Sequence, residues 1–331
     1  MTRRYSLWWL ALAAAALIFP SRSPAPLVYQ PGEGWTYEAV EGGGSWRRDR
    51  AKDQLAVAEA AYGLQDYSLA LKAAKYTVKK WPLSDYAAPA QFLVGQCYEA
   101  KHNDEKAFKA YELVIHKYPN STNINDVLQR QFEIANRFLA GQWFKLWGFI
   151  PFFPSMDRTA GLYHQIVASG PYSIVGPQSQ MNTGAARDKQ KAWEQAAKAY
   201  ETAIYRYLDR PEVASEAFYK AGLSYERQAL KAEYDQSAAG KAIVAFSDFN
   251  TLYPDDPRVP KAKEYIDILK AEQARGAYQT AHYYLKRKKL GAAKIYFGSV
   301  VQLDPNSPYA AEARQRIDQL NNKITAKPAA K

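Results

Sequence analysis

One cysteine, Cys97, stands in a chain of 331 residues, so neither an intramolecular disulfide framework nor a cysteine-rich zinc site can form. The four histidines include no His-Glu-x-x-His pair and none at metal-ligand spacing from a second ligand. The chain also lacks a Gly-x-Ser-x-Gly elbow and a phosphate-binding loop. These absences predict a protein that is not an enzyme, with no catalytic residue, metal, cofactor or small-molecule substrate.

Positive charge is in excess, with 44 Lys and Arg against 33 Asp and Glu, but it is spread along the chain apart from one short run. A nucleic-acid-binding protein would gather such charge on one face or helix, so nucleic acid is not an expected partner. Hydrophobic residues make up 47% of the chain and charged residues 23%, which is typical of a folded protein.

The N-terminus has the layout of a secretory signal peptide. Arg3 and Arg4 precede a 13-residue apolar run, Leu7–Phe19, which is too short to span a membrane comfortably. We predict a signal peptide over residues 1–25, with an uncleaved N-terminal anchor as the alternative. Residues 26–49 are rich in glycine and predict an extended linker, and residues 323–331 predict a disordered tail.

Residues 50–322 carry a repeating helical pattern. Proline-containing turns recur, and numbering the proline as residue 32 of a 34-residue unit brings small residues to positions 8 and 20 and, in the second and last units, an aromatic residue to position 24. The best example contains Gly95, Ala107, Tyr111 and Pro119. The pattern predicts an all-α fold, an α-solenoid of about five to six tetratricopeptide-like helix pairs, and it explains the 25 tyrosines as mainly inter-helix packing residues.

An exported chain with such units resembles the outer-membrane protein assembly factor BamD family (YfiO/ComL). The likeness is strongest in the last unit, where Tyr283-Tyr284-Leu285-Lys286-Arg287 precedes Ala292-Ala293. The resemblance implies a scaffold that binds unfolded outer-membrane protein clients near its N-terminus and the barrel-insertase subunit through its C-terminal repeats. The family is normally lipid-anchored, whereas this chain has no cysteine near the predicted signal.

The first helix of each unit should line the inner face of the solenoid, with positions 2, 5, 9 and 12 on one stripe. In the first three units this stripe combines aromatic rings with amides, which can clamp the backbone of an extended peptide. The predicted peptide-binding groove consists of Tyr62, Phe92, Gln96, Glu99, Phe132 and Asn136. An ordinary solvated face is the alternative.

An aromatic insertion, residues 142–155, interrupts the third unit. Its residues Trp143, Trp147, Phe149 and Phe152 would suit docking to a partner or peripheral contact with a membrane. Packing against the repeats of the same chain is the alternative. The densest charged run, Lys286-Arg287-Lys288-Lys289, predicts a basic patch for an acidic partner or anionic headgroups, with a solvated helix end as its alternative.

Two functional classes follow from these features. The first is a BamD-like, non-catalytic component of β-barrel protein assembly, exported to the periplasm and associated with the inner face of the outer membrane. The second is a different exported tetratricopeptide adaptor, such as a cell-wall or division coordinator or a secretion-apparatus assembly factor. The second class includes a protein held at the inner membrane by its uncleaved signal.

Overall fold

The computed structural model describes residues 27–30, 34–37, 46–120, 123–146, 150–231 and 236–325. The chain divides into two compact units, residues 1–49 and 50–331. In the first unit, β1 (Leu27–Gln30) and β2 (Gly34–Tyr37) form an antiparallel hairpin within the segment predicted as a linker. The predicted signal peptide, residues 1–25, lies outside the described residues, and so does the part of the predicted tail after residue 325.

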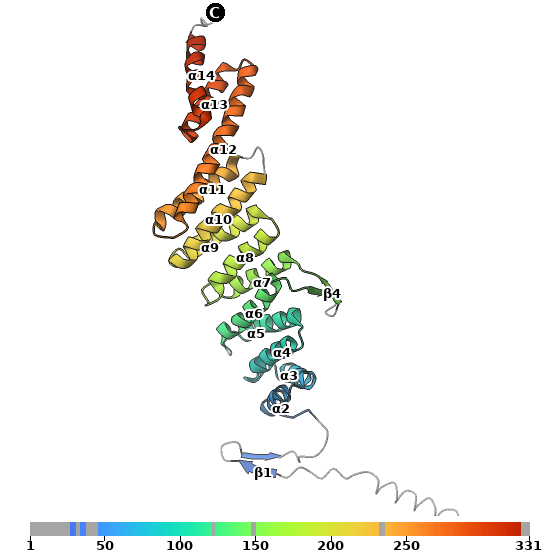
Figure 1. Cartoon of the computed structure of the whole chain (residues 1–331). Coiled ribbons are helices and arrows are strands. Elements are labelled where there is room, and N and C mark those ends of the chain that lie inside the picture. The colour runs from blue at the N-terminus through green and yellow to red at the C-terminus, as the bar shows by residue number, and fades with distance from the viewer. Residues whose placement is uncertain are drawn as a thin grey trace, which may run out of the picture. The chain divides into compact units, whose positions relative to one another are not determined.

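The second unit is built from helices that stack in chain order (Figure 1). They are α2 (Ala51–Gly63), α3 (Tyr67–Lys80), α4 (Ala87–Ala100), α5 (Asp104–Lys117), α6 (Ile124–Leu139), α7 (Met156–Ser169), α8 (Gly176–Lys189), α9 (Trp193–Arg206), α10 (Pro211–Lys231), α11 (Gln236–Leu252), α12 (Val259–Lys286), α13 (Leu290–Leu303) and α14 (Pro308–Thr325). Each packs chiefly against the helices that precede and follow it in the chain. The predicted all-α solenoid is confirmed, with six helix pairs and a final helix over the described residues.

The turn inside a pair has the same backbone conformation in four of the units. Gln65, His102, Lys191 and Lys288 all have positive φ, between 51° and 61°. Each is residue 15 of its unit in the 34-residue numbering, in which position 32 is proline in three of the four units and Leu208 in the unit of Lys191. The left-handed conformation ends the first helix and turns the chain back, so the 34-residue register is visible in the backbone itself.

Glycine at position 8 lets two helices of a pair approach closely. A β-carbon added to Gly95 would lie 2.3 Å from the ring of Tyr111, and one added to Gly184 would lie 2.5 Å from the ring of Tyr200. These rings are at position 24 and are almost fully buried. The repeat signature therefore records a steric fit in which an aromatic side chain fills the space that a β-carbon would occupy.

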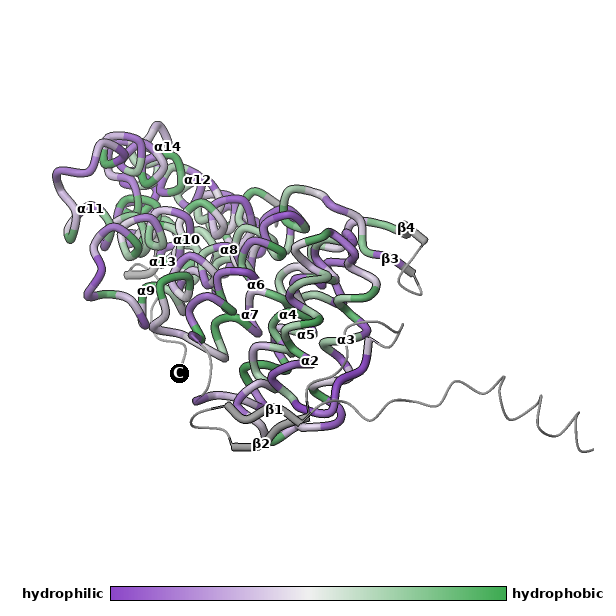
Figure 2. Tube along the Cα trace, turned by 90° about the horizontal axis from the view of Figure 1, so that it is seen from below, coloured by the Kyte–Doolittle hydropathy of each residue, from purple (hydrophilic) through white to green (hydrophobic). Residues whose placement is uncertain are grey.

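The core is a series of apolar clusters along the solenoid, each shared by neighbouring helices. Figure 2 shows hydrophobic and hydrophilic residues alternating along the helices, as expected when one face of each is buried. Helix α12 joins two clusters, because Val259 and Ile266 pack with α11 whereas Ala281 packs with α13. The last two pairs are thus connected by one continuous helix of 28 residues.

The insertion in the third unit is a β-hairpin. Its strands are β3 (Phe144–Leu146) and β4 (Ile150–Phe153), and they pair antiparallel with an irregularity between Phe144 and Lys145. The hairpin separates α6 from α7, yet these two helices still pack together. Ala135, Phe138 and Tyr163 share one buried cluster, so the repeat resumes after the insertion as the sequence predicts.

Candidate functional site

A cavity of about 640 Å³, lined mainly by polar and charged residues, lies on the first three helix pairs. It draws its lining from the first helices α2, α4 and α6, from the turn after α4 and the start of α5, and from the segment after α6 that runs into β3. The lining residues are Tyr62, Gln96, Glu99, Ala100, His102, Asp104, Arg130, Arg137, Gln142, Trp143 and Lys145. A site made by several helices and one inserted segment can be recognised only in the folded chain.

Two carboxylates of the cavity are held by Arg137. Its Nε and Nη2 donate to the two oxygens of Asp104 at 3.0 and 2.9 Å, and its Nη2 also donates to Glu99 Oε1 at 3.0 Å. Gln142 Nε2 donates to Asp104 Oδ2 at 2.6 Å. Burial alone would lower the pKa of Arg137, but the bonds to Asp104 and Glu99 raise it, so the guanidinium stays charged.

Glu99 also accepts a hydrogen bond from the hydroxyl of Tyr111, at 2.9 Å. Burial, together with the charge of Glu99, raises the pKa of Tyr111 far above its ordinary value, so the ring stays neutral. The carboxylate of Glu99 is thereby held between the second helix pair and Arg137 of the third. Through this network the carboxylates of Glu99 and Asp104 are both hydrogen-bonded to side chains of the protein itself.

Of the charged side chains that line the cavity, Arg130 has the weakest contacts within the protein. Its Nη1 lies 4.0 Å from Glu99 and 3.9 Å from Glu133, which is too long for a hydrogen bond, and its side chain is 43% exposed. The amide of Gln96 has no hydrogen-bond partner among the residues that the structure describes. Tyr62 and Trp143 add aromatic surface, and Trp143 is 53% exposed. The cavity thus offers a guanidinium, an amide and two rings to a ligand.

The structure brings three of the six predicted groove residues together, namely Tyr62, Gln96 and Glu99. Phe92 and Phe132 are partly buried instead, and their rings pack against Tyr111 at 5.4 Å and Tyr163 at 6.0 Å. The helical stripe includes both rings, but each packs against an aromatic side chain of a second helix and neither lines the cavity.

Asn136, the sixth predicted groove residue, is used within the protein. Its Oδ1 accepts hydrogen bonds from Tyr163 Oη at 2.6 Å and from Asn182 Nδ2 at 3.1 Å. The amide therefore links α6 to α7 and α8, outside the lining of the cavity.

Sequence reasoning did not select Arg130, Arg137, Asp104 or Gln142. Arg130 and Arg137 are seven residues apart and therefore share a face of α6, which is a signal that the sequence contains. Asp104 and Gln142 carry no such signal, since one begins α5 and the other follows α6. Only the tertiary structure brings them to the same guanidinium.

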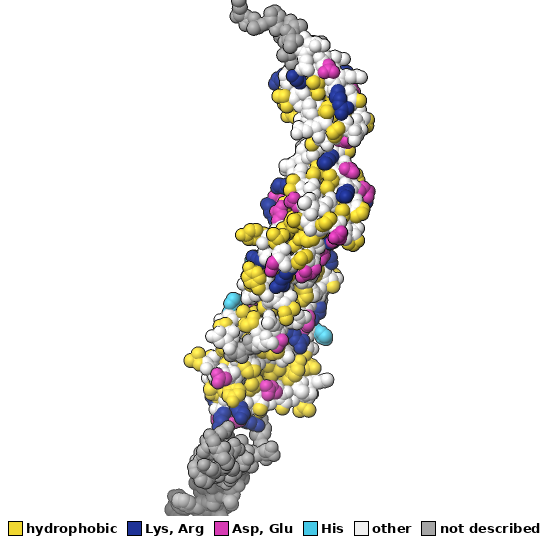
Figure 3. Space-filling model, turned by 90° about the vertical axis from the view of Figure 1, so that its left-hand side faces the viewer, with side chains coloured by type: hydrophobic (Ala, Val, Ile, Leu, Met, Phe, Trp, Pro, Cys, Tyr) yellow, Lys and Arg dark blue, Asp and Glu magenta, His cyan; other side chains and the backbone are white. Residues whose placement is uncertain are grey.

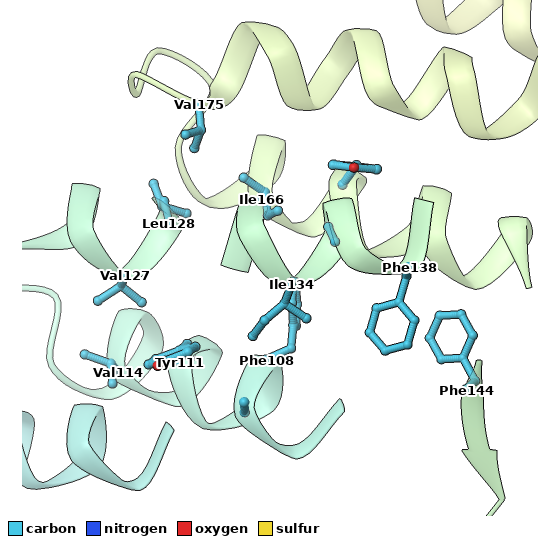
Figure 4. Packing of buried hydrophobic residues seen from close by; sticks show 13 residues of the cluster. Phe108, Tyr111, Val114, Val127, Leu128, Ile134, Phe138, Phe144, Ile166 and Val175 are labelled. Atoms are coloured by element: carbon cyan, nitrogen blue, oxygen red, sulfur yellow. The ribbon is translucent and has the colours of Figure 1, made fainter. Parts of the chain in front are cut away.

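The base of the aromatic hairpin is fixed to the solenoid. Phe144 is 2% exposed, and its ring stacks on Phe138 with centroids 4.0 Å apart and planes 7° apart (Figure 4). The guanidinium of Arg158 lies 4.0 Å from the centroid of Phe144. Glu105 accepts from the backbone N–H of Lys145 and from Arg158, both at 2.6 Å. The base is therefore a packed extension of the third unit.

At this base, Phe153, which pairs with Phe144, is 44% exposed, and Trp143, which precedes Phe144, is 53% exposed. Trp147 and Phe149 of the predicted docking loop lie outside the described residues, and the side chain of Phe152 is also not described. The docking role of this loop stays a prediction.

The predicted basic patch lies at the end of α12 and in the following turn, where Lys286, Arg287, Lys288 and Lys289 are all exposed. The guanidinium of Arg287 lies 4.7 Å from the ring centroid of Tyr283. Elsewhere, acidic and basic side chains are interspersed over the face drawn in Figure 3. This patch is therefore a local concentration of positive charge on a mixed surface.

Cys97 is buried, and burial raises the pKa of its thiol to about 11, which leaves it protonated and unreactive at neutral pH. Within the described ranges, no group of three or more His, Cys, Asp or Glu side chains is placed to hold a metal ion. In the same part of the chain, no helix has the length and apolar character needed to cross a membrane.

The fold and the cavity define a repeat scaffold for protein interactions. A family model described as "Outer membrane lipoprotein" (YfiO) matches residues 164–302, and a tetratricopeptide repeat model matches residues 89–121, the second helix pair. The chain is 25% identical over 161 residues to the outer membrane protein assembly factor BamD of Caulobacter vibrioides. These matches confirm the resemblance to BamD-like tetratricopeptide-repeat proteins.

The match to that BamD covers 49% of this chain and 52% of the relative, so the chain spans about half the length of the curated relative it matches. The family-model match at residues 164–302 contains the basic patch and begins after the last residue that lines the cavity.

Among solved structures, the chain resembles the C-terminal part of a TPR repeat-containing protein from Cytophaga hutchinsonii, with 14% identity and a TM-score of 0.36 over 81% of this chain and 88% of that one. It also resembles a tetratricopeptide repeat protein from Parabacteroides merdae, with 10% identity and a TM-score of 0.33 over 82% and 98%.

Proposed function

We propose that this protein is a non-catalytic scaffold of the cell envelope, a BamD-like component of outer-membrane β-barrel protein assembly. It would act at the periplasmic side of the outer membrane, bind a segment of an unfolded client in the cavity of the first three helix pairs, and bind the barrel insertase through its C-terminal repeats. The similarity to BamD supports the process. The uncommitted donors of the cavity support client binding.

The observation that carries client binding is the position of Arg130 beside Gln96, Tyr62 and Trp143. A segment of extended chain leaves its backbone amides unpaired, and Gln96 can donate to one group and accept from another. The aromatic surfaces suit the apolar and aromatic side chains of a β-strand. Arg130 is available for a client carboxylate, because its own two partners lie about 4 Å away.

The decisive test measures binding of a fluorescent peptide that copies the last strand of an outer-membrane barrel protein. Arg130→Ala should weaken binding about tenfold, the loss expected for one charge-assisted hydrogen bond. Arg227→Ala is a matched control. Arg227 lies 4.0 Å from Asp188 and is 45% exposed, much as Arg130 lies 4.0 Å from Glu99 and is 43% exposed, but it does not line the cavity.

Equal affinity of Arg130→Ala and wild type would contradict client binding in the cavity. An equal loss in Arg130→Ala and Arg227→Ala would do the same, because it would indicate a general charge effect. The helical circular dichroism of both variants should match that of wild type, since each arginine is partly exposed and loosely paired.

The basic patch is the proposed contact for the barrel insertase. Its four basic side chains are exposed at a helix end. A cluster of positive charge attracts an acidic surface on a partner protein. Affinity purification from solubilised envelope should recover the insertase with wild type and lose it with Arg287→Glu combined with Lys288→Glu. Recovery of other envelope proteins without the insertase would support the alternative, a different exported adaptor.

The aromatic hairpin is the proposed peripheral docking element. Its base is held rigidly through Phe144, and Trp143 and Phe153 are partly exposed beside it. Trp147→Ser combined with Phe152→Ser should reduce association with the membrane fraction and leave the helical signal intact. Unchanged association would exclude this role.

A further inference from the structure

A second cavity, of about 410 Å³, lies between α3, α4 and α5. On α4, Val94 and Tyr98 face this cavity, whereas Gln96 and Glu99 face the first one. At about 100° per residue, these two pairs lie on different sides of the helix. The second cavity therefore opens on a different face of the solenoid from the proposed client site.

The rim of this cavity carries positive charge only. Five of its residues are lysines, and no carboxylate lines it. We call the cavity and its rim the lysine groove, and its lysines are Lys75, Lys79, Lys106, Lys109 and Lys117. All five are exposed.

These lysines lack acidic partners, unlike others in the chain. Lys198, Lys220 and Lys261 each pair with a glutamate three or four residues away. None of the five lysines of the groove forms an ion pair within the described ranges. Lys75 and Lys79 on α3, and Lys106 and Lys109 on α5, are three or four residues apart, a spacing at which like charges on a helix repel each other.

The floor of the groove is apolar. Val78, Val94, Ala110 and Leu113 line it, and Leu113 is 42% exposed although it stands between lysines. Tyr98 also lines the groove. Its hydroxyl accepts from Lys75 Nζ at 2.6 Å, while Lys106 lies 5.9 Å from its ring centroid. An apolar recess within a ring of cations matches a ligand that has apolar side chains flanked by carboxylates.

We propose that the lysine groove binds an acidic peptide segment of a partner protein, with one or two leucine or aromatic side chains inserted between α3 and α5. Charge complementarity identifies the partner, because five cations face a cavity without an acid. The recessed apolar floor favours a peptide over a membrane, because a side chain can enter a concavity whereas a bilayer presents a broad surface. The groove would let the scaffold hold a partner while its first cavity holds a client.

The test uses the full chain and a fluorescent 14-residue probe peptide of glutamate and leucine residues, with a glutamine-for-glutamate version as the ligand control. Wild type should bind the acidic probe and not the glutamine version. Raising the salt from about 50 to 500 mM should weaken the interaction at least tenfold, because the charges are exposed. Lys79→Glu combined with Lys109→Glu should also weaken it at least tenfold.

Lys263→Glu combined with Lys270→Glu is the matched protein control. It makes the same change in net charge at two exposed positions of α12, far along the chain from the groove, and it should alter the affinity less than twofold. Leu113→Ser tests the floor and should weaken binding of the acidic probe without any change of charge. Circular dichroism checks that all variants keep their helices.

Three outcomes would overturn the proposal. One is equal binding of the acidic and glutamine probes. Another is an equal loss in the groove and control double variants. The last is binding to phosphatidylglycerol vesicles that depends on Lys79 and Lys109 and that the acidic probe does not compete for, which would assign the groove to a membrane surface.

Discussion

Gly184→Ala is expected to destabilise the fourth helix pair, even though alanine favours a helix more than glycine does. The new β-carbon would lie 2.5 Å from Cε1 and 2.6 Å from Cζ of Tyr200, whereas ordinary contact begins at 3.4 Å. Helices α8 and α9 would have to separate by about 1 Å, or the ring would have to leave its place.

Tyr200 has little freedom to move. It is 1% exposed, it lies in a buried cluster with Met181 and Tyr207, and its hydroxyl donates to Asp188 at 3.0 Å. Overpacking a core of this kind costs about 1–3 kcal/mol. Replacing glycine with alanine in a helix by itself stabilises the folded state by about 0.5–1 kcal/mol. The expected net loss in the free energy of unfolding is therefore on the order of 1–2 kcal/mol.

Urea denaturation followed by circular dichroism measures this loss. If the curve has more than one step, the step that Gly184→Ala shifts reports the loss, because each unit of a solenoid contacts mainly its neighbours. Gly161→Ala is the matched control, since Gly161 lies within α7 with no atom within 4 Å of an added β-carbon. That variant should gain about 0.5–1 kcal/mol from helix propensity alone.

A double variant tests whether the ring of Tyr200 causes the loss. Tyr200→Leu removes the ring. In this background Gly184→Ala should lower the free energy of unfolding clearly less than it does in wild type. If Gly184→Ala is as stable as wild type, or if it moves with Gly161→Ala in the same direction, the steric explanation of the repeat signature is refuted.

Three further predictions concern other parts of the solenoid. A thiol reagent at pH 8 should leave Cys97 unmodified in the native protein and label it in urea, because the thiol is buried and its pKa is about 11; rapid native labelling would contradict this. Hydrogen bonds from Arg258 hold the pKa of Asp256 below its usual range, so the ionised carboxylate stabilises the folded protein above about pH 4. Wild type should therefore be more stable than Asp256→Asn above this pH and lose that advantage below it. A stability difference that stays constant down to about pH 2 in acid titrations would refute the pairing. Lys191→Gly should raise the midpoint of urea unfolding. Lys191 has a φ of 58°, a conformation that costs glycine about 1 kcal/mol less than lysine. A lower midpoint would contradict this.

The repeat could be predicted because it depends on contacts that are close in sequence. Gly95 and Tyr111 are 16 residues apart, and their packing follows from one helix turning back on the previous one. The same local rule identifies the third unit on both sides of its insertion, through Phe138 and Tyr163. The spacing of small and aromatic residues therefore determined the fold class.

The groove could be predicted only in part. A stripe of residues along a helix shows which way their side chains point, but not which neighbouring side chains pack over them. The stripe includes Phe92 and Phe132 beside Gln96, but both phenylalanines are partly buried and pack against rings from the second helices. It omits Asp104 and Gln142, which lie outside the first helices and reach the cavity through Arg137. A cavity depends on how neighbouring units and the hairpin pack, and this information is absent from the periodicity.

The sequence by itself determined the helical repeat, its register and the resemblance to BamD-like proteins, because the repeat rests on contacts between residues that are close in the chain. Only the tertiary structure decided which side chains stay free to bind a partner. It commits Glu99 and Asp104 to Arg137, leaves Arg130 available, and gathers the lysines of α3 and α5 around one apolar recess. The physical reason is that binding surfaces arise between units, from pairings that no single repeat contains.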